Sequence, residues 1–393
     1  MNGTIYMPVG EVCSSISDTY REKKNMVTLI NTSDVLEGRV LNHERVPNSN
    51  LKGQFKKTFQ RDDILYSEIR PQNRRFAYVD FSPIDYIAST KLMVIRVKKD
   101  VVSPKYLYYF LKNSSTVAEL QLLAETRSGT FPQITFSEVA NLTIPVPSLA
   151  VQEVIVQTMQ CLEDKITCNE QINDNLEQQA QSYFQELFVD NADPEWAIGT
   201  ISDLGTVVGG STPSKAKPEY YTESGIAWIT PKDLSINKSK FVSHGENDIT
   251  ELGLKNSSAA IMPEGTVLFS SRAPIGYIAI AAGEVTTNQG FKSVVPKPEI
   301  GTPFVYFFLK NTLPVIEGMA SGSTFKEVSG STMKNVPAVI PDAETLAKFS
   351  DFCAPIFAQQ RILEEQNQSL ATLRDNLLPK LMSGEIDVSA VQL

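Results

Sequence analysis

Histidine, the side chain that most often serves as a catalytic acid or base, is scarce in this chain. Only two histidines, His43 and His244, occur among its 393 residues. This scarcity argues against a histidine-rich metal site and against Ser/His or Cys/His catalysis. We therefore expect both histidines in surface loops, and we expect neither a metal site nor a catalytic residue in this chain.

The short motifs that bind nucleotides or catalytic metals are also missing. The sequence has no G-x-x-x-x-G-K-[ST] phosphate loop, no H-E-x-x-H and no [DN]-P-P-[YF] tetrapeptide, the last being expected of an amino-methyltransferase. The glycine-rich stretch 204–211 does not fit a dinucleotide or S-adenosylmethionine loop, so we interpret it as a turn. The chain is not expected to bind a cofactor of its own.

The densest group of positive side chains lies between residues 52 and 75, where phenylalanines 55, 59 and 76 are interleaved with or adjoin the basic residues. The net charge of −9 is unevenly distributed, with +4 over residues 1–148, −9 over 149–195, 0 over 196–340 and −4 over 341–393. A local basic face is enough to hold a phosphate backbone. The acidic total therefore does not exclude a nucleic acid partner.

The first residues, the lengths of the apolar runs and the cysteines indicate the cellular compartment of the protein. The start has no basic stretch followed by an apolar one, no window approaches eighteen apolar residues, and the four cysteines form no C-x-x-C pair. We expect reduced thiols in a cytoplasmic protein with no membrane contact.

The chain repeats itself at a period of roughly 195–200 residues. The run Phe-Leu-Lys-Asn ends both segment 104–113 and segment 302–311, and Asp62–Ser67 parallels Gly265–Ser270. Ser128–Phe131 parallels Gly322–Phe325, and Asn141–Pro147 parallels Asn335–Pro341. The repeat predicts two globular units built on one plan.

Each unit begins with short β-rich runs and then has a short helix. Strands are predicted at 26–30, 63–66 and 92–97 in the first unit, and at 266–269, 277–280 and 291–295 in the second. Short amphipathic helices are predicted from Pro104 to about Leu111 and from Pro303 to about Lys310, since proline suits the first helical turn.

A longer helical run closes each unit. Heptad-spaced residues are Ile155, Leu162, Asn169, Leu176 and Tyr183 in the first run, and Phe349, Ile356, Leu363, Leu370 and Leu377 in the second. The alternative to a mutual helix pair is an ordinary amphipathic helix packed on its own domain. Because two matched runs of about forty residues follow two matched units, we favour the pair, a rod of ~50–60 Å. Asn169, Asn173 and Asn367 would set its register, and Pro355 is expected to break the second helix.

The sequence predicts a mixed α+β fold with two tandem α/β domains, each followed by a long helix, the two helices forming a coiled coil. The expected boundaries are 1–148 for the first domain, 149–190 for the first spacer helix, 191–341 for the second domain, 342–384 for the second spacer helix and 385–393 for a tail.

Several motifs resemble one family, the specificity subunits of type I restriction–modification systems. They are Gly210–Pro213, Ile229–Asp233, Ser271–Gly276, Thr287–Phe291 and the long run Leu370–Ile386. The resemblance covers essentially the whole chain and is strongest in its second half. The first half departs from the pattern, because it lacks the Gly-Ser-Thr-Pro and Asn-Gln-Gly-Phe elements and has Ser89–Leu92 in their place.

The resemblance implies a protein without catalysis of its own that reads a bipartite site in double-stranded DNA, one half per recognition domain. It also implies that the two helices pack as an antiparallel coiled coil with pseudo-two-fold symmetry and set the gap. It also implies two methyltransferase subunits, which bind S-adenosylmethionine and methylate adenine. Restriction/translocase subunits that use ATP and Mg would complete the endonuclease.

The expected DNA contacts follow from the chemistry of phosphates and base edges, since lysine and arginine grip phosphates while arginine, amide and hydroxyl groups read bases. In the first domain the candidates are Lys52, Lys56, Lys57, Arg61, Arg70, Arg74, Arg75, Arg127, Thr130 and Gln133. In the second they are Ser211, Lys215, Lys217, Arg272, Ser323, Thr324 and Lys326. For each one taken alone, a solvated surface position is the alternative.

Two other classes of function remain open at this point. One is a fused enzyme that carries its own methyltransferase, against which the missing motifs argue. The other is a coiled-coil adaptor or inhibitor that binds restriction–modification proteins without reading DNA.

Overall fold

The computed structural model describes residues 4–22, 24–49, 53–127, 131–322 and 326–388. The chain forms two compact units, one made of Met1–Ile166 with Ser369–Leu393 and the other of Thr167–Gln368. Both unit boundaries fall inside long helices, α5 (Leu149–Gln185) and α11 (Ala343–Ser383). Each unit is described by itself.

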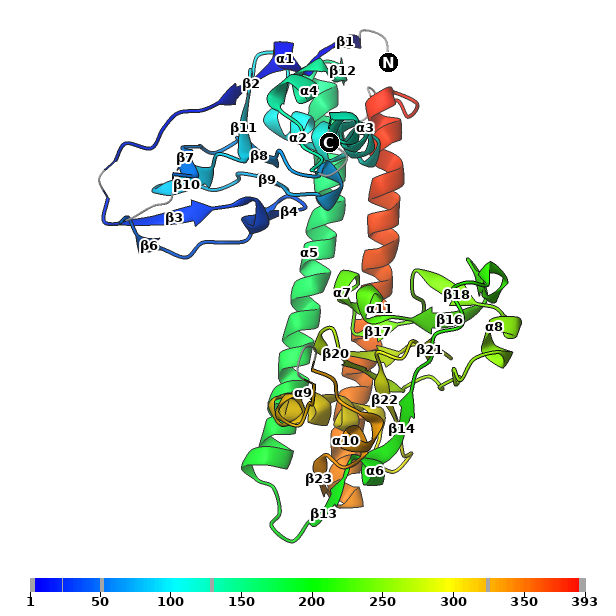
Figure 1. Ribbon diagram of the computed structural model, residues 1–393. Coiled ribbons are helices and arrows are strands. Elements are labelled where there is room, and N and C mark those ends of the chain that lie inside the picture. Colours follow the sequence, from blue (N-terminus) through cyan, green and yellow to red (C-terminus); the bar gives the residue numbers. More distant parts are fainter. Residues whose placement is uncertain (1–3, 23, 50–52, 128–130, 323–325, 389–393) are drawn as a thin grey trace. The chain divides into compact units, whose positions relative to one another are not determined.

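The first unit, blue to cyan in Figure 1, is built mainly on two four-stranded sheets with the orders β6-β3-β10-β7 and β2-β11-β8-β9. Its strands are β1 (Ile5–Pro8), β2 (Cys13–Ile16), β3 (Met26–Ile30), β4 (Val35–Leu36), β5 (Arg39–Val40), β6 (Val46–Pro47), β7 (Phe55–Lys57), β8 (Ile64–Ser67), β9 (Phe76–Tyr78), β10 (Tyr86–Ser89), β11 (Leu92–Val97) and β12 (Thr143–Val146). Its helices are α1 (Val9–Val12), α2 (Pro104–Lys112), α3 (Ser114–Arg127) and α4 (Phe136–Asn141), with 3-10 turns η1 (Thr32–Asp34) and η2 (Pro71–Asn73).

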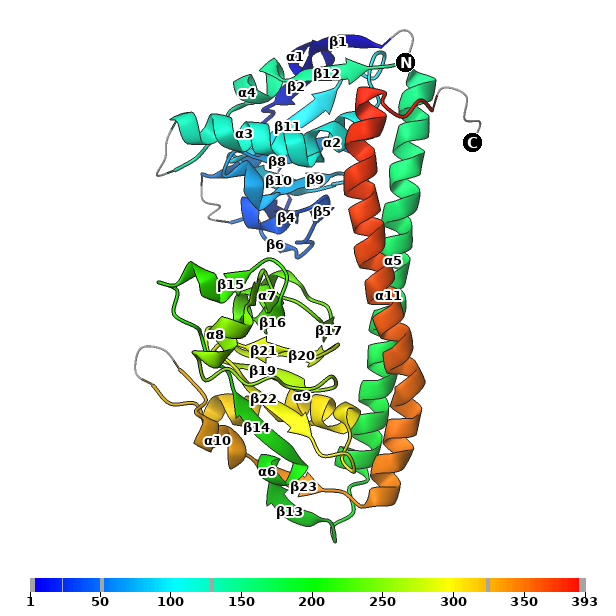
Figure 2. The same cartoon turned by 90° about the vertical axis from the view of Figure 1, so that its right-hand side faces the viewer.

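Strand β11 is the central strand of the core sheet, paired antiparallel with both β2 and β8. Five of its six side chains are buried, as expected of a strand covered on both faces. Helix α2 begins at Pro104, and the Ser103 hydroxyl caps it by accepting from the Tyr106 N–H at 3.2 Å. Figure 2 shows α2 beside the last turns of α11, where Leu378, Leu381 and Met382 join the core of this unit.

The second unit, green to orange in Figure 1, has a five-stranded sheet of order β14-β22-β19-β20-β17 and a four-stranded sheet of order β15-β18-β16-β21. Its strands are β13 (Ala197–Thr200), β14 (Gly205–Gly209), β15 (Tyr221–Thr222), β16 (Ile226–Ile229), β17 (Phe241–Val242), β18 (Asn247–Ile249), β19 (Val267–Ser271), β20 (Ile275–Ala281), β21 (Thr286–Thr287), β22 (Lys292–Pro296) and β23 (Pro337–Ile340). Its helices are α6 (Ile201–Leu204), α7 (Pro231–Ile236), α8 (Glu251–Lys255), α9 (Thr302–Gly318) and α10 (Gly330–Lys334), with a 3-10 turn η4 (Pro218–Tyr220) and a π-helical turn η3 (Glu186–Asp190) after α5.

Two expectations about helix ends are wrong. Helix α9 does not stop near Lys310 but continues through Pro314 to Gly318, and α11 is continuous past Pro355. A proline inside a helix removes one backbone hydrogen bond. Buried neighbours offset that loss, since Ile316 in α9 and Cys353, Ile356 and Phe357 in α11 all pack in the core of the second unit. Tertiary packing therefore outweighs the local preference at both prolines.

The two long helices run antiparallel where they pack in the second unit. Asn169 of α5 donates to the Asn367 side chain of α11 at 2.8 Å, and Asn173 donates to the Gln360 carbonyl at 3.4 Å. Further along, the Tyr183 ring lies 4.6 Å from that of Phe352. Partner numbers fall as α5 numbers rise, which is the mutual pair that the heptads predicted in the antiparallel order that the family resemblance implied.

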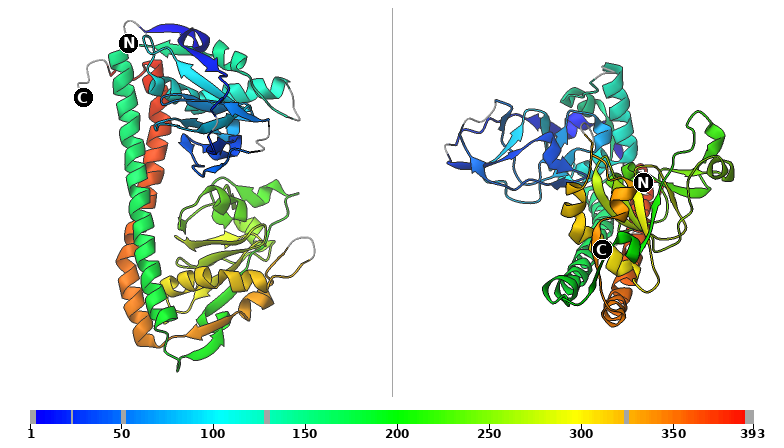
Figure 3. Two further views of the ribbon diagram at one scale, coloured as in Figure 1. Left: turned by 90° about the vertical axis from the view of Figure 1, so that its left-hand side faces the viewer. Right: turned by 60° about the horizontal axis from the view of Figure 1, so that its bottom comes forward.

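Each unit is closed by two different helix segments. The core of the first unit takes Ile155 and Met159 from the start of α5 and Leu381 from the end of α11. The core of the second unit takes Phe349 from the start of α11 and Phe184 from the end of α5. Figure 3 shows the yellow α9 meeting that end of α5. Each unit thus combines the start of its own helix with the end of the other repeat's helix.

Candidate nucleic-acid interface

The same backbone hydrogen bonds join three loops in both units. In the first unit, the Glu68 N–H donates to the Lys91 carbonyl at 3.0 Å, and the Ile134 N–H donates to the Glu68 carbonyl at 2.9 Å. In the second, the Ser271 N–H donates to the Gly290 carbonyl at 2.7 Å, and the Val328 N–H donates to the Ser271 carbonyl at 3.0 Å. The repeat therefore extends to a loop framework at the ends of β8 and β19.

The first loop cluster consists of Glu68, Arg70, Lys91 and Gln133. Lys91 donates to the side chains of Glu68 and Gln133, each at 3.3 Å. The Arg70 N–H donates to the Pro132 carbonyl at 3.1 Å, and Ile69 forms an isolated bridge with Gln133. Arg70 is exposed and has a left-handed backbone with φ of 44°. Two cations, one carboxylate and one amide therefore lie together at this loop junction.

The second loop cluster consists of Thr212, Arg272, Gln289, Lys292 and Glu327. Arg272 and Lys292 reach the Glu327 carboxylate at 3.4 and 3.8 Å. Thr212 donates to the Gln289 side chain. Burial lowers the pKa of Lys292, although Glu327 opposes the shift. This cluster has the same framework as the first, but its Glu327 carboxylate contacts both cations and stands where the first cluster has the Gln133 amide.

Four of the quoted sequence motifs meet at the second loop cluster. The Ser211 N–H donates to the Thr287 carbonyl at 2.9 Å, and the Asn288 N–H donates to the Ile229 carbonyl at 3.0 Å. At Gly210 an added Cβ would lie only 2.0 Å from the Asn288 carbonyl oxygen. The motif that begins with this glycine therefore lets two loops approach each other closely.

Five of the predicted basic residues hold the first unit's own loops together. The acceptors are the Thr90 and Leu92 carbonyls for Lys57, the Asp80 carbonyl for Arg61, the Ser114 hydroxyl for Arg74, the Ser33 carbonyl for Arg75 and the Glu138 carboxylate for Arg127. Burial lowers the pKa of Lys57. The phenylalanines at 59 and 76 belong to the core and cannot stack on bases.

Other residues predicted to contact DNA have fewer contacts within the protein. Lys56, Arg70, Lys215 and Lys326 are exposed, and their side chains have no hydrogen-bond or ion-pair partner among the described residues. The Lys217 ammonium lies 5.3 Å from the Tyr220 ring centroid, and Ser211 is half-buried. Lys52, Thr130, Ser323 and Thr324 lie outside the described residues.

The structure brings only part of the predicted set together. Arg70 joins Gln133, and Arg272 lies beside the segment that carries Lys326, whereas Arg61 lies at the opposite end of β8. Lys91, Gln289, Lys292 and Glu327 were missed. Only Gln289 had a signal, because it belongs to the quoted Asn-Gln-Gly-Phe motif.

The predicted coiled-coil residues lie on inward or half-buried positions of the long helices. Ile155, Leu162 and Leu377 pack in or against the core of the first unit, and Leu176, Tyr183 and Ile356 do so in the second. Leu363 is buried and Leu370 is half-buried.

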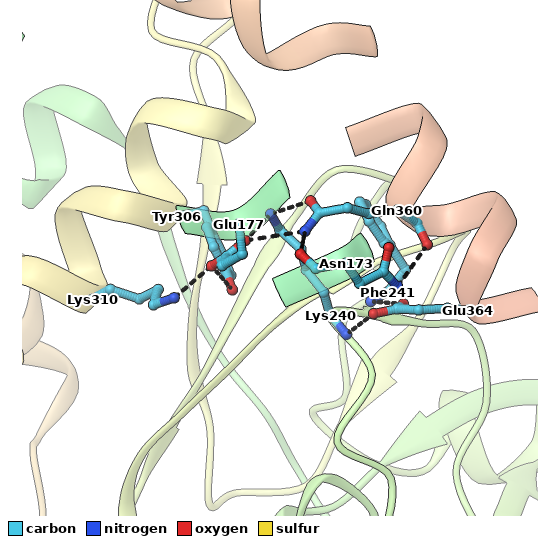
Figure 4. A network of polar contacts seen from close by, with 8 residues as sticks. All are labelled: Asn173, Glu177, Lys240, Phe241, Tyr306, Lys310, Gln360 and Glu364. Atoms are coloured by element: carbon cyan, nitrogen blue, oxygen red, sulfur yellow. Dashed lines mark hydrogen bonds and ion pairs between the residues drawn. The ribbon is translucent and has the colours of Figure 1, made fainter. Parts of the chain in front are cut away.

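A buried polar network joins the second unit to its helices (Figure 4). Lys240 donates to Glu177 at 2.7 Å and to Gln360 at 2.9 Å, while Tyr306 and Lys310 also donate to Glu177. Glu364 accepts from the Lys240 and Phe241 N–H groups at 2.7 and 3.0 Å. The Lys240 ammonium also lies 3.5 Å from the Phe357 ring centroid.

Charge compensation decides the protonation of this network. Burial alone would raise the pKa of Glu177, but the ammonium groups of Lys240 and Lys310 outweigh it and lower the pKa to about 2. Burial lowers the pKa of Lys240 to about 8, although Glu177 opposes the shift. Both partners are therefore charged at neutral pH, and the network acts as an internal ionic contact between sheet and helix.

The first unit has a smaller version of this contact. Lys112 and Tyr109 of the α2 segment both donate to Glu163 of α5. Lys112 is nearly as buried as Lys240, and burial lowers its pKa against the effect of Glu163. Glu163 pairs with one charged lysine here, whereas Glu177 pairs with two.

Two further searches cover the described part of the chain. Within it, no three His, Cys, Asp or Glu side chains are grouped so that they could hold a metal ion. None of its helices is long and apolar enough to cross a membrane.

Comparison with known proteins places these features in a family. The profile of the type I restriction modification DNA specificity domain matches residues 6–178 and 194–373. The chain is similar to the HindI specificity subunit of Haemophilus influenzae, with 29% identity over 92% of this chain and 94% of that protein. It is also similar to the MjaIX specificity subunit of Methanocaldococcus jannaschii, with 39% identity over 47% of this chain and 45% of that protein.

A solved structure shows a similar fold. The type I restriction–modification S subunit from M. genitalium superimposes with a TM-score of 0.55 and 17% identity, covering 97% of each chain. Each family match covers one sequence repeat and most of the long helix that follows it. The chain therefore belongs to the family of type I restriction modification DNA specificity proteins.

Proposed function

We propose that this chain is the DNA-reading, non-catalytic subunit of a type I restriction–modification complex. The observation that carries the proposal is the loop framework that recurs in both units with different polar side chains. A framework that is kept while its side chains change suits two surfaces that read different bases.

The first loop cluster would read one half of a bipartite site in double-stranded DNA, and the second loop cluster would read the other. Arg70 and Lys326, both exposed, would contact phosphates, and Gln133, Gln289 and Glu327 would face base edges. Recognition domains at 1–148 and 191–341 and spacer helices at 149–190 and 342–384 are the division that goes with this function, and the helices would set the gap.

The catalytic activities of the complex would belong to its partner subunits. Two methyltransferase subunits would bind S-adenosylmethionine and methylate adenine, and restriction/translocase subunits would use ATP and Mg. We place the complex in the cytoplasm. The scarcity of histidine and the missing cofactor motifs support a chain without catalysis of its own.

Footprinting tests the DNA function directly. The chain assembled with its methyltransferase subunit is expected to protect two short DNA segments separated by an unprotected gap. Protection of no specific site would instead favour a coiled-coil adaptor or inhibitor. Methylation of site-bearing DNA by the purified chain alone would overturn the non-catalytic assignment.

The spacer is tested by a change of length. One heptad inserted into both helices, after Ile166 and after Gln368, keeps the heptad phase and adds about 10 Å of helix. The gap is expected to grow by on the order of three base pairs, at 3.4 Å each, with both half-sites unchanged. Genome-wide methylation mapping reads both quantities, and a changed half-site would contradict the spacer role.

A further inference from the structure

Each unit has a surface pocket at its outer two-stranded sheet. The pocket in the first unit has a volume of about 380 Å³, and the pocket in the second has about 360 Å³. We call them the first and second end pockets. The first is lined in part by Tyr6, Phe110, Asn113, Pro145 and Met382, and the second by Ile198, Phe308, Asn311, Val339 and Phe188.

Four positions of these linings correspond between the two pockets. Tyr6 pairs with Pro145 across β1 and β12, as Ile198 pairs with Val339 across β13 and β23. The Phe-Leu-Lys-Asn run supplies a phenylalanine and an asparagine to both pockets. Each pocket also takes residues from the end of the other repeat's helical segment, with Met382 of α11 in one pocket and Phe188 of the turn η3 after α5 in the other. The two end pockets are therefore one structural feature made twice.

Both pockets expose apolar surface that the fold itself does not use. The exposed fraction is 63% for Tyr6 and 86% for Ile198, although both lie in strands. Among the described residues, β1 pairs only with β12 and β13 only with β23, so each small sheet has open edges. An exposed apolar group beside an open edge is the kind of surface that proteins usually cover.

We infer that the two end pockets are the docking sites for two copies of one partner, the methyltransferase subunit, each copy inserting an apolar side chain. This inference rests on the proposed function. A partner present twice must meet the same surface twice. The end pockets meet this requirement, because their linings correspond while the loop clusters differ between the units.

The lining defines the chemistry of the inserted group. No charged side chain lines the second end pocket, whereas Lys380 and Glu385 line part of the first, so a buried charge in the second pocket would be uncompensated. The asparagine shared by both pockets is a polar group that can orient a neighbouring backbone amide. The group that fits is an aliphatic or aromatic side chain flanked by main chain able to hydrogen-bond to that amide.

The test changes one exposed pocket residue in each unit of the full chain. I198D and Y6D place a charge in the second and first end pockets, and I236D and I84D place one at equally exposed sites elsewhere, with exposed fractions of 71% and 72%. The methyltransferase subunit is titrated against each chain, and native mass spectrometry counts the bound copies. Urea unfolding and the conservative variants I198L and Y6F check that the fold is retained.

We expect two bound copies for the wild type, I236D, I84D, I198L and Y6F, and one for I198D or Y6D. The double variant I198D/Y6D should bind none, and affinity for the lost copy should fall by at least about 30-fold, as for a central interface residue. Two copies bound to I198D and to Y6D would overturn the inference. So would a self-association of the chain that these variants abolish while the methyltransferase count stays at two.

The proposed function is judged separately, by the footprint of the wild-type complex. A normal bipartite footprint together with two copies on both variants would reject the end pockets alone. A wild-type complex that protects no specific site would reject the DNA-reading function, whatever the copy number.

Discussion

The two units share much of their backbone plan, and three matched positions show how their side chains differ. Gln133 in the first loop cluster corresponds to Glu327 in the second, Asp63 at the start of β8 corresponds to Thr266, and the matched lysines Lys112 and Lys310 pair with different glutamates of α5, Glu163 and Glu177. The first position is on the surface, and the other two are internal. The difference teaches that the repeat preserves hydrogen bonds of the main chain and allows side chains to diverge even where they are buried.

The largest expected effect sharpens the comparison of the two junctions. E177A leaves Lys240, with an exposed fraction of 7%, and the more exposed Lys310 without their carboxylate. Loss of one partner of a buried pair typically costs about 3–5 kcal/mol. E163A leaves only Lys112 and should cost less. Urea unfolding of both variants measures the two losses, and equal values would mean that the second lysine adds nothing.

Acid unfolding gives a related measurement at the same junction. Because the pKa of Glu177 is lowered from 4.5 to about 2, its contribution to stability is present above pH 4.5 and is lost as the pH falls toward 2. The full difference is about 3 kcal/mol. E177Q should therefore show a shallower fall in the free energy of unfolding between pH 5 and pH 3 than the wild type. Parallel curves would contradict the assigned pKa. Glu364, whose pKa is raised by burial, acts in the opposite direction in both proteins.

The buried pair at β8 provides the next test. Asp63 is fully buried and accepts two hydrogen bonds from Arg96, at 2.7 and 2.8 Å. D63A should cost about 2–4 kcal/mol, since hydrogen bonds to charged groups contribute more than neutral ones. At the matched position, T266V removes one hydroxyl bond to the Pro263 carbonyl and should cost about 1 kcal/mol. Thermal unfolding compares the two losses of stability, and a larger loss for T266V than for D63A would contradict this ranking.

The smallest expected effect concerns the loop clusters. An amide can both donate and accept, as adenine requires, whereas a carboxylate only accepts, as the amino group of cytosine requires. Q133E and E327Q should each shift base preference at one position by about 1–3 kcal/mol, and each in a different half-site. Methylation mapping of strains carrying either variant reads both half-sites. A change in the same half-site for both variants would break the one-unit, one-half-site scheme.

Local patterns predicted the scaffold better than the surface. Runs such as Leu92–Val97 carry their own signal, because a strand buried on both faces is continuously apolar. The acceptors of Arg74 and Arg75 lie about forty residues away in sequence, so no local pattern shows that these arginines are already engaged. Lys91 and Lys292 enter the loop clusters only through strand pairing, and Lys240 looks like any surface lysine until its environment is known.

The exchange of helix ends between repeats has a consequence for how the protein is made. The side chains of Leu378, Leu381 and Met382 complete the core of the first unit, yet the ribosome adds them after every residue of the second unit. Throughout that interval the nascent first unit has an uncovered apolar face. A chain that terminates before residue 378 keeps that face exposed. Early termination therefore yields a product that is prone to aggregation and proteolysis.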